Sequence, residues 1–302
     1  MENFVLIGVF LGLGLLFRRI KAFPRDFAQS LNFFALYISL PALILLKVPQ
    51  LNFSSELLVA ALAPWGMLLL SVLLVLLGAR IWHWSRSCTA VLLLIVPLGN
   101  TSFMGVPMVQ AFFGAAGIPF LIIYDQIGTL LIFATYGSFI LALYGREGSM
   151  DLAMVARRVL FFPPTIALVI GLALRQWDYP DQLVRALEDV SVSIVPLVMT
   201  AVGFQLRLRL RPGILAPLGY GMAIKLLAAP VVALLVCRLL GLSGLASDIA
   251  VFEAGMPPMV TAGALAVAAG LDAELSVALV GFGIFFSFVS LPLIYWLLQV
   301  FP

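Results

Sequence analysis

The stretch that decides the fold of this chain reads Val96-Pro97-Leu98-Gly99-Asn100-Thr101-Ser102-Phe103-Met104-Gly105-Val106-Pro107. It places two prolines, two glycines and three consecutive polar side chains inside a long apolar run. Proline removes a helical hydrogen bond and clashes with the preceding turn, so a helix is broken here. At membrane depth, the backbone groups freed by a break are tolerated only against protein or a water-filled cavity. The stretch therefore predicts an interrupted transmembrane helix.

The composition around it is that of a protein that crosses the membrane many times. Of 302 residues, 63% are apolar and 10% are charged, whereas a soluble domain carries about 25% charged residues. At about 20 apolar residues per crossing, the chain has material for roughly nine or ten helices. This excludes soluble enzymes, nucleic-acid binders and disordered proteins, and the excess of arginine indicates orientation in the membrane.

Few residues could serve catalysis or hold a cofactor. The one histidine, His83, lies between Trp82 and Trp84, which is typical of an aromatic anchor at the membrane surface. Cys88 and Cys237 lack the paired spacing of a metal site, and no lysine lies in a phosphate-binding loop motif. We therefore expect no enzymatic activity and no cofactor, and we expect Na⁺, H⁺ or the membrane potential, not ATP, to drive transport.

Apolar runs bounded by charges or turn residues predict ten spans in two sets of five. The first set covers residues 3–17, 27–46, 57–79, 88–113 and 118–144. The second set covers residues 159–174, 187–205, 213–237, 247–269 and 275–299. When the loops are assigned alternately to two sides, one side carries twelve Lys and Arg and the other carries four. By the positive-inside rule, we expect a plasma (inner) membrane protein with both termini outside.

The two sets of spans resemble each other. The matching positions, at offsets of 157, 155, 150 and 153 residues, are Gly14 and Gly171, Pro41 and Pro196, Gly105-Val106-Pro107 and Gly255-Met256-Pro257, and Gly117 and Gly270. Because each set has an odd number of spans, the second enters the membrane from the opposite side, which makes an inverted repeat. The chain thus divides into repeat 1, residues 1–146, and repeat 2, residues 147–302.

Span 247–269 is interrupted like span 88–113, at Glu253-Ala254-Gly255-Met256-Pro257-Pro258. Matched interruptions in two halves indicate the binding site of a transporter, where helix N-termini suit a carboxylate and helix carbonyl ends suit a small cation. Taken singly, each proline could be an ordinary kink in a membrane helix. Their equivalent placement favours the binding site.

Three ionisable residues, Asp125, Lys225 and Glu253, fall inside spans, where a charge costs about 2.5–3.5 kcal/mol on insertion scales. Thr129 lies one helical turn after Asp125. With Asn100, the two carboxylates and this hydroxyl form a candidate Na⁺ site, unless the carboxylates share a proton. Asp125 could instead lie at a wet loop end. Lys225 could form an ion pair, snorkel to the surface or contact the substrate.

The run Asn100-Thr101-Ser102-Phe103-Met104-Gly105-Val106-Pro107, which Phe113-Gly114 closes, resembles the signature of the auxin efflux carrier family. The segment from Lys225 to Pro230 is similar to the basic-to-proline segment of that family in span 8. Glu253-Ala254-Gly255-Met256 is similar to the Glu-x-Gly-Met of bile acid/sodium symporters, in which the glutamate helps to hold Na⁺. The chain departs from the symporters at Pro257-Pro258, where they carry a polar amide, and it lacks the long cytoplasmic loop of several plant auxin carriers.

The resemblance implies a scaffold of spans 1, 2, 6 and 7, and a transport core of spans 3–5 and 8–10 in which spans 4 and 9 cross at their breaks. It implies a secondary transporter of a small organic anion, with elevator-like alternating access in the lipid bilayer and a homodimer formed through the scaffold. We expect substrate contacts from Asn100, Thr101, Gly105, Pro107, Gln126, Lys225, Met256 and Pro257. We expect cation or proton contacts from Asn100, Asp125, Thr129 and Glu253, with Na⁺ at the last three.

Two other functions stay open, an anion channel and an intramembrane aspartyl protease. Tyr124-Asp125 imitates one half of such a protease site. The other half requires Gly-x-Gly-Asp, and the nearest match is Ala269-Gly270-Leu271-Asp272 in a predicted loop. No feature of the sequence favours a channel, so a carrier is the preferred interpretation.

Overall fold

The computed structural model describes residues 2–24, 26–51, 56–145, 157, 159–206 and 212–301. Throughout these ranges the regular elements are helices, with no strand beyond one isolated bridge. Helices long and apolar enough to cross a membrane cover Phe27–Gln50, Leu57–Trp82, Ala115–Tyr144, Asp181–Gln205, Leu215–Leu239 and Ala273–Val300. Shorter apolar helices cover Val5–Phe17, Arg86–Ile95 and Pro163–Ala173. The chain is thus an all-helical membrane protein, whereas the ten-span inverted repeat stays a prediction.

The chain divides into two compact units. The first unit comprises Met1–Ser54, Ser102–Ile122 and Arg157–Leu206. Its elements are α1 (Glu2–Phe17), α2 (Phe27–Phe34), η1 (Ala35–Ser39), α3 (Leu40–Lys47), η2 (Val48–Gln50), α6 (Gly105–Phe113), η3 (Ala115–Gly117), most of α7 (Ile118–Ile123), α10 (Pro163–Ala173), α11 (Asp181–Val192) and α12 (Ile194–Gln205). Among these, η1 is a π-helical turn.

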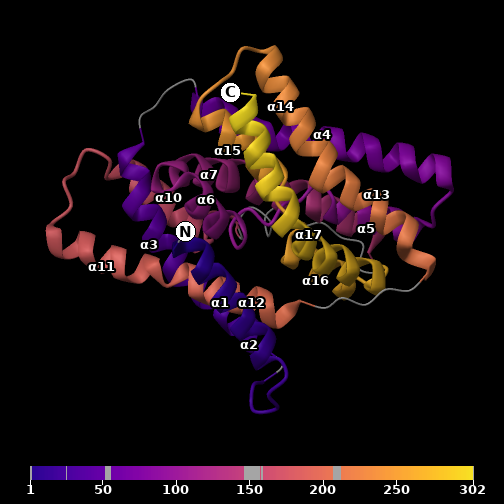
Figure 1. Ribbon diagram of the computed structural model, residues 1–302, viewed down its shortest axis with the longest axis horizontal. Helices are drawn as coiled ribbons and strands as arrows, with labels where there is room; N and C mark the ends of the chain where they lie inside the picture. Colours follow the sequence, from indigo (N-terminus) through magenta and orange to yellow (C-terminus); the bar gives the residue numbers. More distant parts are fainter. Residues whose placement is uncertain are drawn as a thin grey trace. The chain divides into compact units, whose positions relative to one another are not determined.

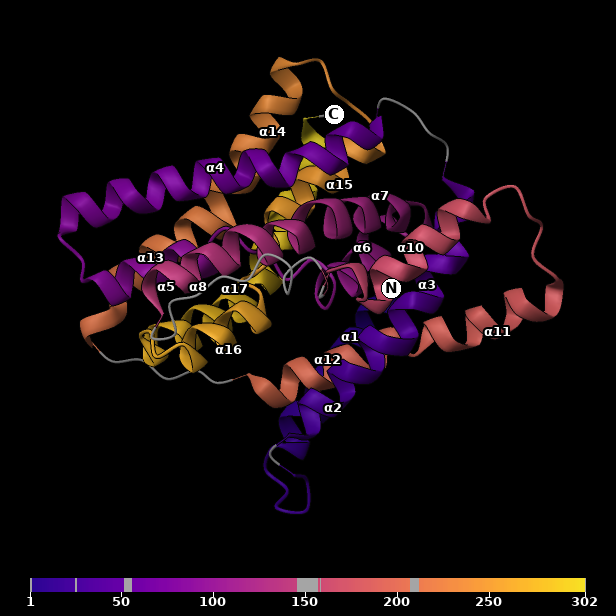
Figure 2. The same cartoon turned by 180° about the vertical axis from the view of Figure 1, so that it is seen from behind.

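Two pairs of helices in the first unit lie side by side, α1 with α12 and α3 with α10 (Figure 1 and Figure 2). The first pair is in backbone contact. A Cβ at Gly14 would lie 2.1 Å from the Thr200 carbonyl oxygen, and a Cβ at Gly203 would lie 2.2 Å from the Leu11 carbonyl oxygen. No side chain fits at either position, so glycine is what lets these helices approach, as in other membrane helix pairs.

Each of two helices in this unit changes course shortly before a proline. The π-helical η1 precedes Pro41, and a break at Ser193 separates α11 from Pro196 in the first turn of α12. Proline cannot donate to the preceding turn, so the local change in helix geometry accommodates it. A 2.7 Å hydrogen bond joins the Oγ atoms of Ser39 and Ser193, and thereby connects the two interruptions.

The second unit comprises Ser55–Thr101, Ile123–Ala156 and Arg207–Pro302. Its elements are α4 (Glu56–Trp82), α5 (Arg86–Ile95), η4 (Tyr124–Leu130), η5 (Phe133–Gly137), α8 (Ser138–Tyr144), η6 (Pro212–Ile214), α13 (Leu215–Ala223), η7 (Ile224–Ala228), α14 (Ala229–Leu239), α15 (Leu245–Ala254), α16 (Val260–Ala268) and α17 (Ala273–Val300). The segments η4, η5 and η7 are π-helical turns inside longer helices.

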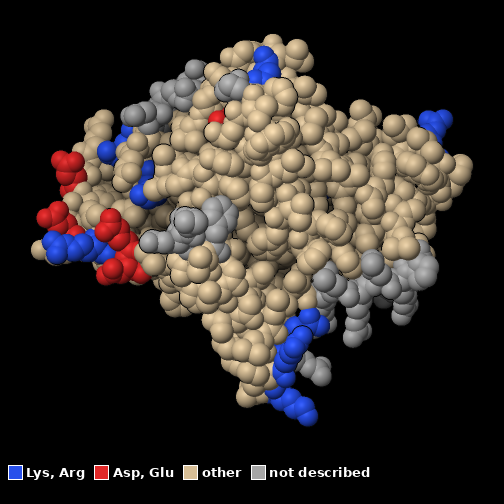
Figure 3. Space-filling view, viewed as in Figure 1, with Lys and Arg blue, Asp and Glu red and all other residues tan. Residues whose placement is uncertain are grey.

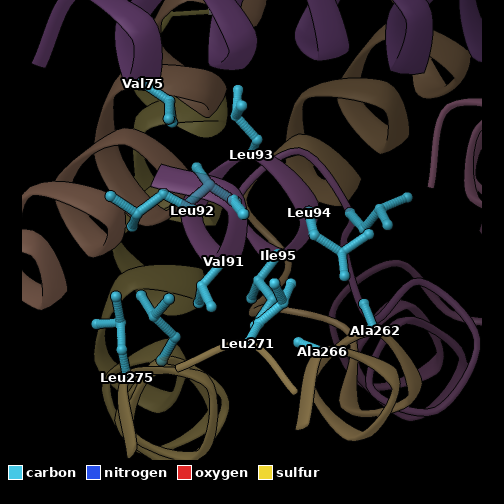
Figure 4. Packing of buried hydrophobic residues seen from close by; sticks show 14 of the residues in the cluster. Val75, Val91, Leu92, Leu93, Leu94, Ile95, Ala262, Ala266, Leu271 and Leu275 are labelled. Atoms are coloured by element: carbon cyan, nitrogen blue, oxygen red, sulfur yellow. The ribbon is translucent and has the colours of Figure 1, made fainter. Parts of the chain in front are cut away.

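The centre of the second unit is α5. Every side chain from Ala90 to Val96 is at most 3% exposed, which is the condition of a helix that is apolar on all sides. Figure 4 shows Val91 to Ile95 among side chains of three other helices, with Val75 from α4, Ala262 from α16 and Leu275 from α17. The break that follows α5 therefore lies inside protein, away from lipid.

Apolar side chains also cover the outside of the molecule. On α4, Leu58, Leu62, Leu69 and Leu73 are between 61% and 71% exposed. The face seen in Figure 3 carries few charges, and its Asp and Glu residues gather over α11. A broad apolar exterior of this kind fits contact with lipid chains.

The structure corrects one detail of the sequence comparison. Gly105-Val106-Pro107 forms the first turn of α6, after the first break, whereas Gly255-Met256-Pro257 follows the end of α15 and lies in the second break. The two tripeptides therefore lie on different sides of their breaks, and the equivalence at an offset of 150 residues is wrong. Proline is accepted in both places, because neither a first helical turn nor an unwound segment needs its N–H.

Gly14→Ala is expected to destabilise the protein, because the added methyl group collides with the backbone of α12. Overpacking of this kind lowers the free energy of unfolding by about 1–3 kcal/mol, which a thermal unfolding curve of the detergent-solubilised protein would register. Gly12→Ala on the same helix is the matched control, since no heavy atom lies within 4 Å of its added Cβ. Equal unfolding temperatures for the two variants would contradict the described packing.

Candidate functional site

The two helix breaks of the second unit lie against each other. The backbone after α5 pairs with the backbone after α15 in an isolated antiparallel bridge. The Asn100 N–H donates to the Pro257 carbonyl oxygen at 2.7 Å. The Met259 N–H donates to the Leu98 carbonyl oxygen at 3.0 Å. This paired region, here called the crossover, consists of residues 96–101 and 255–259.

Prolines account for both breaks. Pro97 comes two residues after the end of α5, and Pro257-Pro258 begins three residues after the end of α15. Neither helix can continue, because proline has no N–H to donate to the preceding turn. Each unpaired buried backbone group would cost about 1–3 kcal/mol. The pairing at the crossover supplies the partners that water supplies in an ordinary loop.

Asp125 joins η4 to the crossover. One carboxylate oxygen accepts a hydrogen bond from the Thr101 hydroxyl, and the other accepts from the Gln126 side-chain amide at 2.7 Å. All three side chains are buried, with Asp125 only 4% exposed. The alternative of a wet loop end for Asp125 is therefore wrong. Its carboxylate thereby positions the break after α5 against η4.

Lys225 joins η7 to the end of α15. Its Nζ donates to the carbonyl oxygen of Ala254, the last residue of α15, at 3.2 Å. The side chain is 3% exposed, so it does not snorkel to the surface. The carbonyl end of a helix carries partial negative charge, which favours an ammonium group there.

Glu253 and Asn100 have unused hydrogen-bonding capacity. Glu253 is 0% exposed, and neither carboxylate oxygen finds a donor in the part of the chain that the structure describes. The Asn100 side-chain NH₂ likewise finds no acceptor among the described residues. The charges of Asp125 and Lys225 act on Glu253, so these three ionisable groups form one cluster. Buried groups of this kind are normally satisfied, so the crossover is a candidate ligand site.

Two of the three ionisable side chains lie on π-helical turns. Asp125, Gln126 and Thr129 lie on the π-helical η4, and Lys225 lies on the π-helical η7. A π-helical turn widens the helix locally and redirects its side chains, and such turns occur frequently at functional sites. No local pattern in the sequence predicts these π-helical turns.

Most of the predicted site residues belong to the second unit, where they are buried. They are Asn100, Thr101, Asp125, Gln126, Thr129, Lys225, Glu253, Met256 and Pro257. Gly105 and Pro107 lie in the first unit, in the first turn of α6. Their contacts with a substrate stay a prediction.

Sequence reasoning missed two contributors. Tyr124 lies close enough to Glu253 to experience its charge. Gly99 leaves room for the ammonium group of Lys225, since a Cβ there would lie 3.2 Å from Nζ. Gly99 could have been found from the sequence, because it is a glycine inside a break that prolines bound. Tyr124 gave no signal beyond its place next to Asp125.

One of the alternatives, the intramembrane protease, finds no support in this geometry. Among the described residues, no three His, Cys, Asp or Glu side chains form a metal-binding group. Asp272, the expected second carboxylate of a protease, caps the N-terminus of α17 by accepting from the Leu275 N–H at 3.0 Å. Asp125 is bonded to Thr101 and Gln126 instead. The Na⁺ site at Asp125, Thr129 and Glu253 stays a prediction.

Comparison with known proteins identifies the family. A family profile described as membrane transport protein matches residues 1–295. The chain belongs to this family. An uncharacterized transporter of Methanothermobacter thermautotrophicus is 28% identical to it over 295 residues, which cover 97% of this chain and 96% of the relative. An uncharacterized transporter of Methanocaldococcus jannaschii is 25% identical over 294 residues, which cover 91% of each chain.

Membership of the membrane transport protein family confirms the resemblance to auxin efflux carriers that residues 100–114 carry. The relatives are named as transporters, so this transport protein is grouped with proteins that move solutes. The name of the family includes no substrate. The class of solute must therefore be argued from the crossover itself.

Thr101→Val is expected to destabilise this transport protein, because valine keeps the shape of threonine but leaves one oxygen of Asp125 without its hydroxyl donor. An orphaned buried acceptor lowers the free energy of unfolding by about 1–3 kcal/mol, or more for a charged group. Thr101→Ser keeps the hydroxyl and is the matched control. Thermal unfolding in detergent would measure both variants. A valine variant as stable as the serine variant would show that the Thr101–Asp125 bond contributes little.

Proposed function

We propose that this transport protein carries a small organic anion, a carboxylate, across the plasma membrane by alternating access. The observation that supports the proposal best is the unsatisfied Asn100 amide at the crossover, buried between two half-helices of a membrane protein. An amide NH₂ donates hydrogen bonds, which suits a ligand with negatively charged oxygens.

Two further features favour an anion over a neutral or cationic solute. The half-helix α16 begins at Val260, directly after the crossover. The first N–H groups of a helix have no intrahelical acceptor and carry partial positive charge, which favours a carboxylate. Lys225 adds a full positive charge at the same crossover. Thr101, Gln126, Met256 and Pro257 complete the proposed substrate site.

The division of the chain into two units supports an elevator-like mechanism. The second unit holds the crossover and the ionisable cluster, and corresponds to the proposed transport core. The first unit holds the glycine-packed pair α1 and α12, and corresponds to the proposed scaffold, through which two copies would form a homodimer. Movement of one unit against the other would carry the site between the two sides of the membrane, with both termini outside. A gradient of Na⁺ or H⁺, or the membrane potential, would drive it.

Counterflow in proteoliposomes tests this function. Vesicles loaded with an unlabelled mono- or dicarboxylate should take up the same labelled compound transiently, whereas a channel would conduct ions without counterflow. Asn100→Ala should lower the initial rate of uptake by about tenfold or more, since a hydrogen bond to a charged group contributes about 1.5–3 kcal/mol.

Gln182→Ala, at an exposed position of α11, is the matched control and should transport normally. A monodisperse gel-filtration profile would show that each variant is folded. The proposal is wrong if no carboxylate exchanges in the unmodified protein, or if Asn100→Ala exchanges as fast as the control.

A further inference from the structure

The carbonyl end of α15 already holds a cation. Half-helix ends of this kind coordinate Na⁺ in secondary transporters, because their last carbonyl groups carry partial negative charge and lack intrahelical donors. Here the Lys225 ammonium donates to the Ala254 carbonyl oxygen at 3.2 Å, from a side chain that is 3% exposed. Gly99, in the other segment of the crossover, lies close to the same ammonium group, because a Cβ there would lie 3.2 Å from Nζ.

The carboxylate next to this carbonyl is unsatisfied. Glu253 precedes Ala254, and neither of its oxygens has a donor within the described ranges of the chain. Asp125 is in the opposite situation, with Thr101 and Gln126 each donating to one of its oxygens. Lys225 donates to a carbonyl oxygen rather than to either carboxylate. Of the two carboxylates, Glu253 is therefore the one whose ionised form has no hydrogen-bond donor among the described residues.

The charges of the cluster do not balance when all three groups are ionised. Lys225 contributes one positive charge, and Asp125 and Glu253 contribute two negative charges. A buried charge without a counter-charge is strongly disfavoured, so one more positive charge must be bound. A Na⁺ ion at the end of α15 would have to compete with the ammonium group of Lys225 for the Ala254 carbonyl oxygen. A proton on Glu253 removes the negative charge without a set of oxygen ligands.

We infer that Lys225 is a tethered cation that takes the place of free Na⁺ at the end of α15, and that Glu253 carries the coupling proton. The inference rests on the proposed transport of an anion. Glu253 takes a proton from water on one side of the membrane and returns it to water on the other side, once in each cycle. The anion moves with the proton, because an ionised Glu253 repels an anion bound beside Asn100. Transport then follows the pH gradient and does not depend on Na⁺.

Few other titratable groups could interfere with this proton. The groups that interact electrostatically with Glu253 are Asp125 and Tyr124 of η4 and Lys225 of η7. The helices that pack against α15 are α4, α14 and α17. Among the side chains that the structure describes, the ionisable ones on these helices are Arg80 on α4, Cys237 and Arg238 on α14, and Glu274 and Tyr295 on α17. Asp125 and Lys225 are the charged groups that act most strongly on Glu253, and Arg238 pairs with Asp248 at 3.5 Å.

Uptake driven by a pH gradient separates the two coupling ions. Proteoliposomes placed in a more acidic medium should accumulate a labelled monocarboxylate about tenfold per pH unit, the limit for one proton per anion. The accumulation should be equal in sodium and choline media. Accumulation that requires Na⁺, or that ignores the pH gradient, would overturn the inference and leave the proposed function standing.

Glu253→Gln tests the proton carrier itself. Glutamine is close in shape to protonated glutamate and cannot release a proton, so this variant should retain counterflow and lose accumulation driven by the pH gradient. Glu188→Gln, at an exposed position of α11, is the matched control and should keep both activities. A Glu253→Gln protein that still accumulates anion in response to the pH gradient would contradict the assignment, and so would one that loses counterflow.

Infrared spectroscopy of the purified protein needs no substrate. The carbonyl stretch of a protonated carboxylic acid should be present in the unmodified protein, unchanged by Na⁺, and missing in Glu253→Gln. Lys225→Met should allow Na⁺ to remove this band, whereas Lys225→Arg, which keeps the cation, should not. A band that is missing from the unmodified protein, or that Na⁺ removes there, would overturn the inference. A failure of counterflow with this band intact would overturn only the proposed function.

Discussion

A backbone in the middle of a bilayer has no water to bond with, and the structure around the crossover follows from that constraint. Pro97, Pro257 and Pro258 end two helices inside the membrane. The freed backbone groups are tolerated because each unwound segment bonds to the other, through two hydrogen bonds of 2.7 and 3.0 Å. This pairing requires the two segments to be buried together. The fully buried position of α5 among α4, α16 and α17 meets that requirement.

The same burial determines what the polar side chains near the crossover can do. Asp125 is satisfied by Thr101 and Gln126, and Lys225 by the last carbonyl of α15. Glu253 and the Asn100 amide lie in the same low-dielectric interior with bonding capacity left over. Among the described polar side chains at the crossover, Glu253 and the Asn100 amide are the ones left without a partner, which suits a ligand and an exchangeable positive charge. Stability alone does not require either group.

Several elements were predictable because their causes are local. Proline and polar residues inside an apolar run predicted both breaks, and the length of the apolar runs predicted the membrane helices. Asp125, Lys225 and Glu253 stood out because charges are rare in such runs. The match between Gly105–Pro107 and Gly255–Pro257 misled, because the tripeptides are alike in sequence but lie on different sides of their breaks. Similar residues do not guarantee equivalent backbone positions, because proline is acceptable both in a first helical turn and in an unwound segment.

A helical membrane protein with two interrupted spans and three charges inside spans could be inferred from local sequence, since hydropathy and proline chemistry act within a few residues. The partner of each polar group depends instead on how distant segments pack. Thr101 donates to a carboxylate 24 residues away, and Lys225 donates to a carbonyl 29 residues away. Those pairings depend on how α5, α15 and the π-helical turns η4 and η7 pack together. No pattern of neighbouring residues encodes that packing. The packing is also what leaves the carboxylate of Glu253 without a hydrogen-bond donor among the described residues.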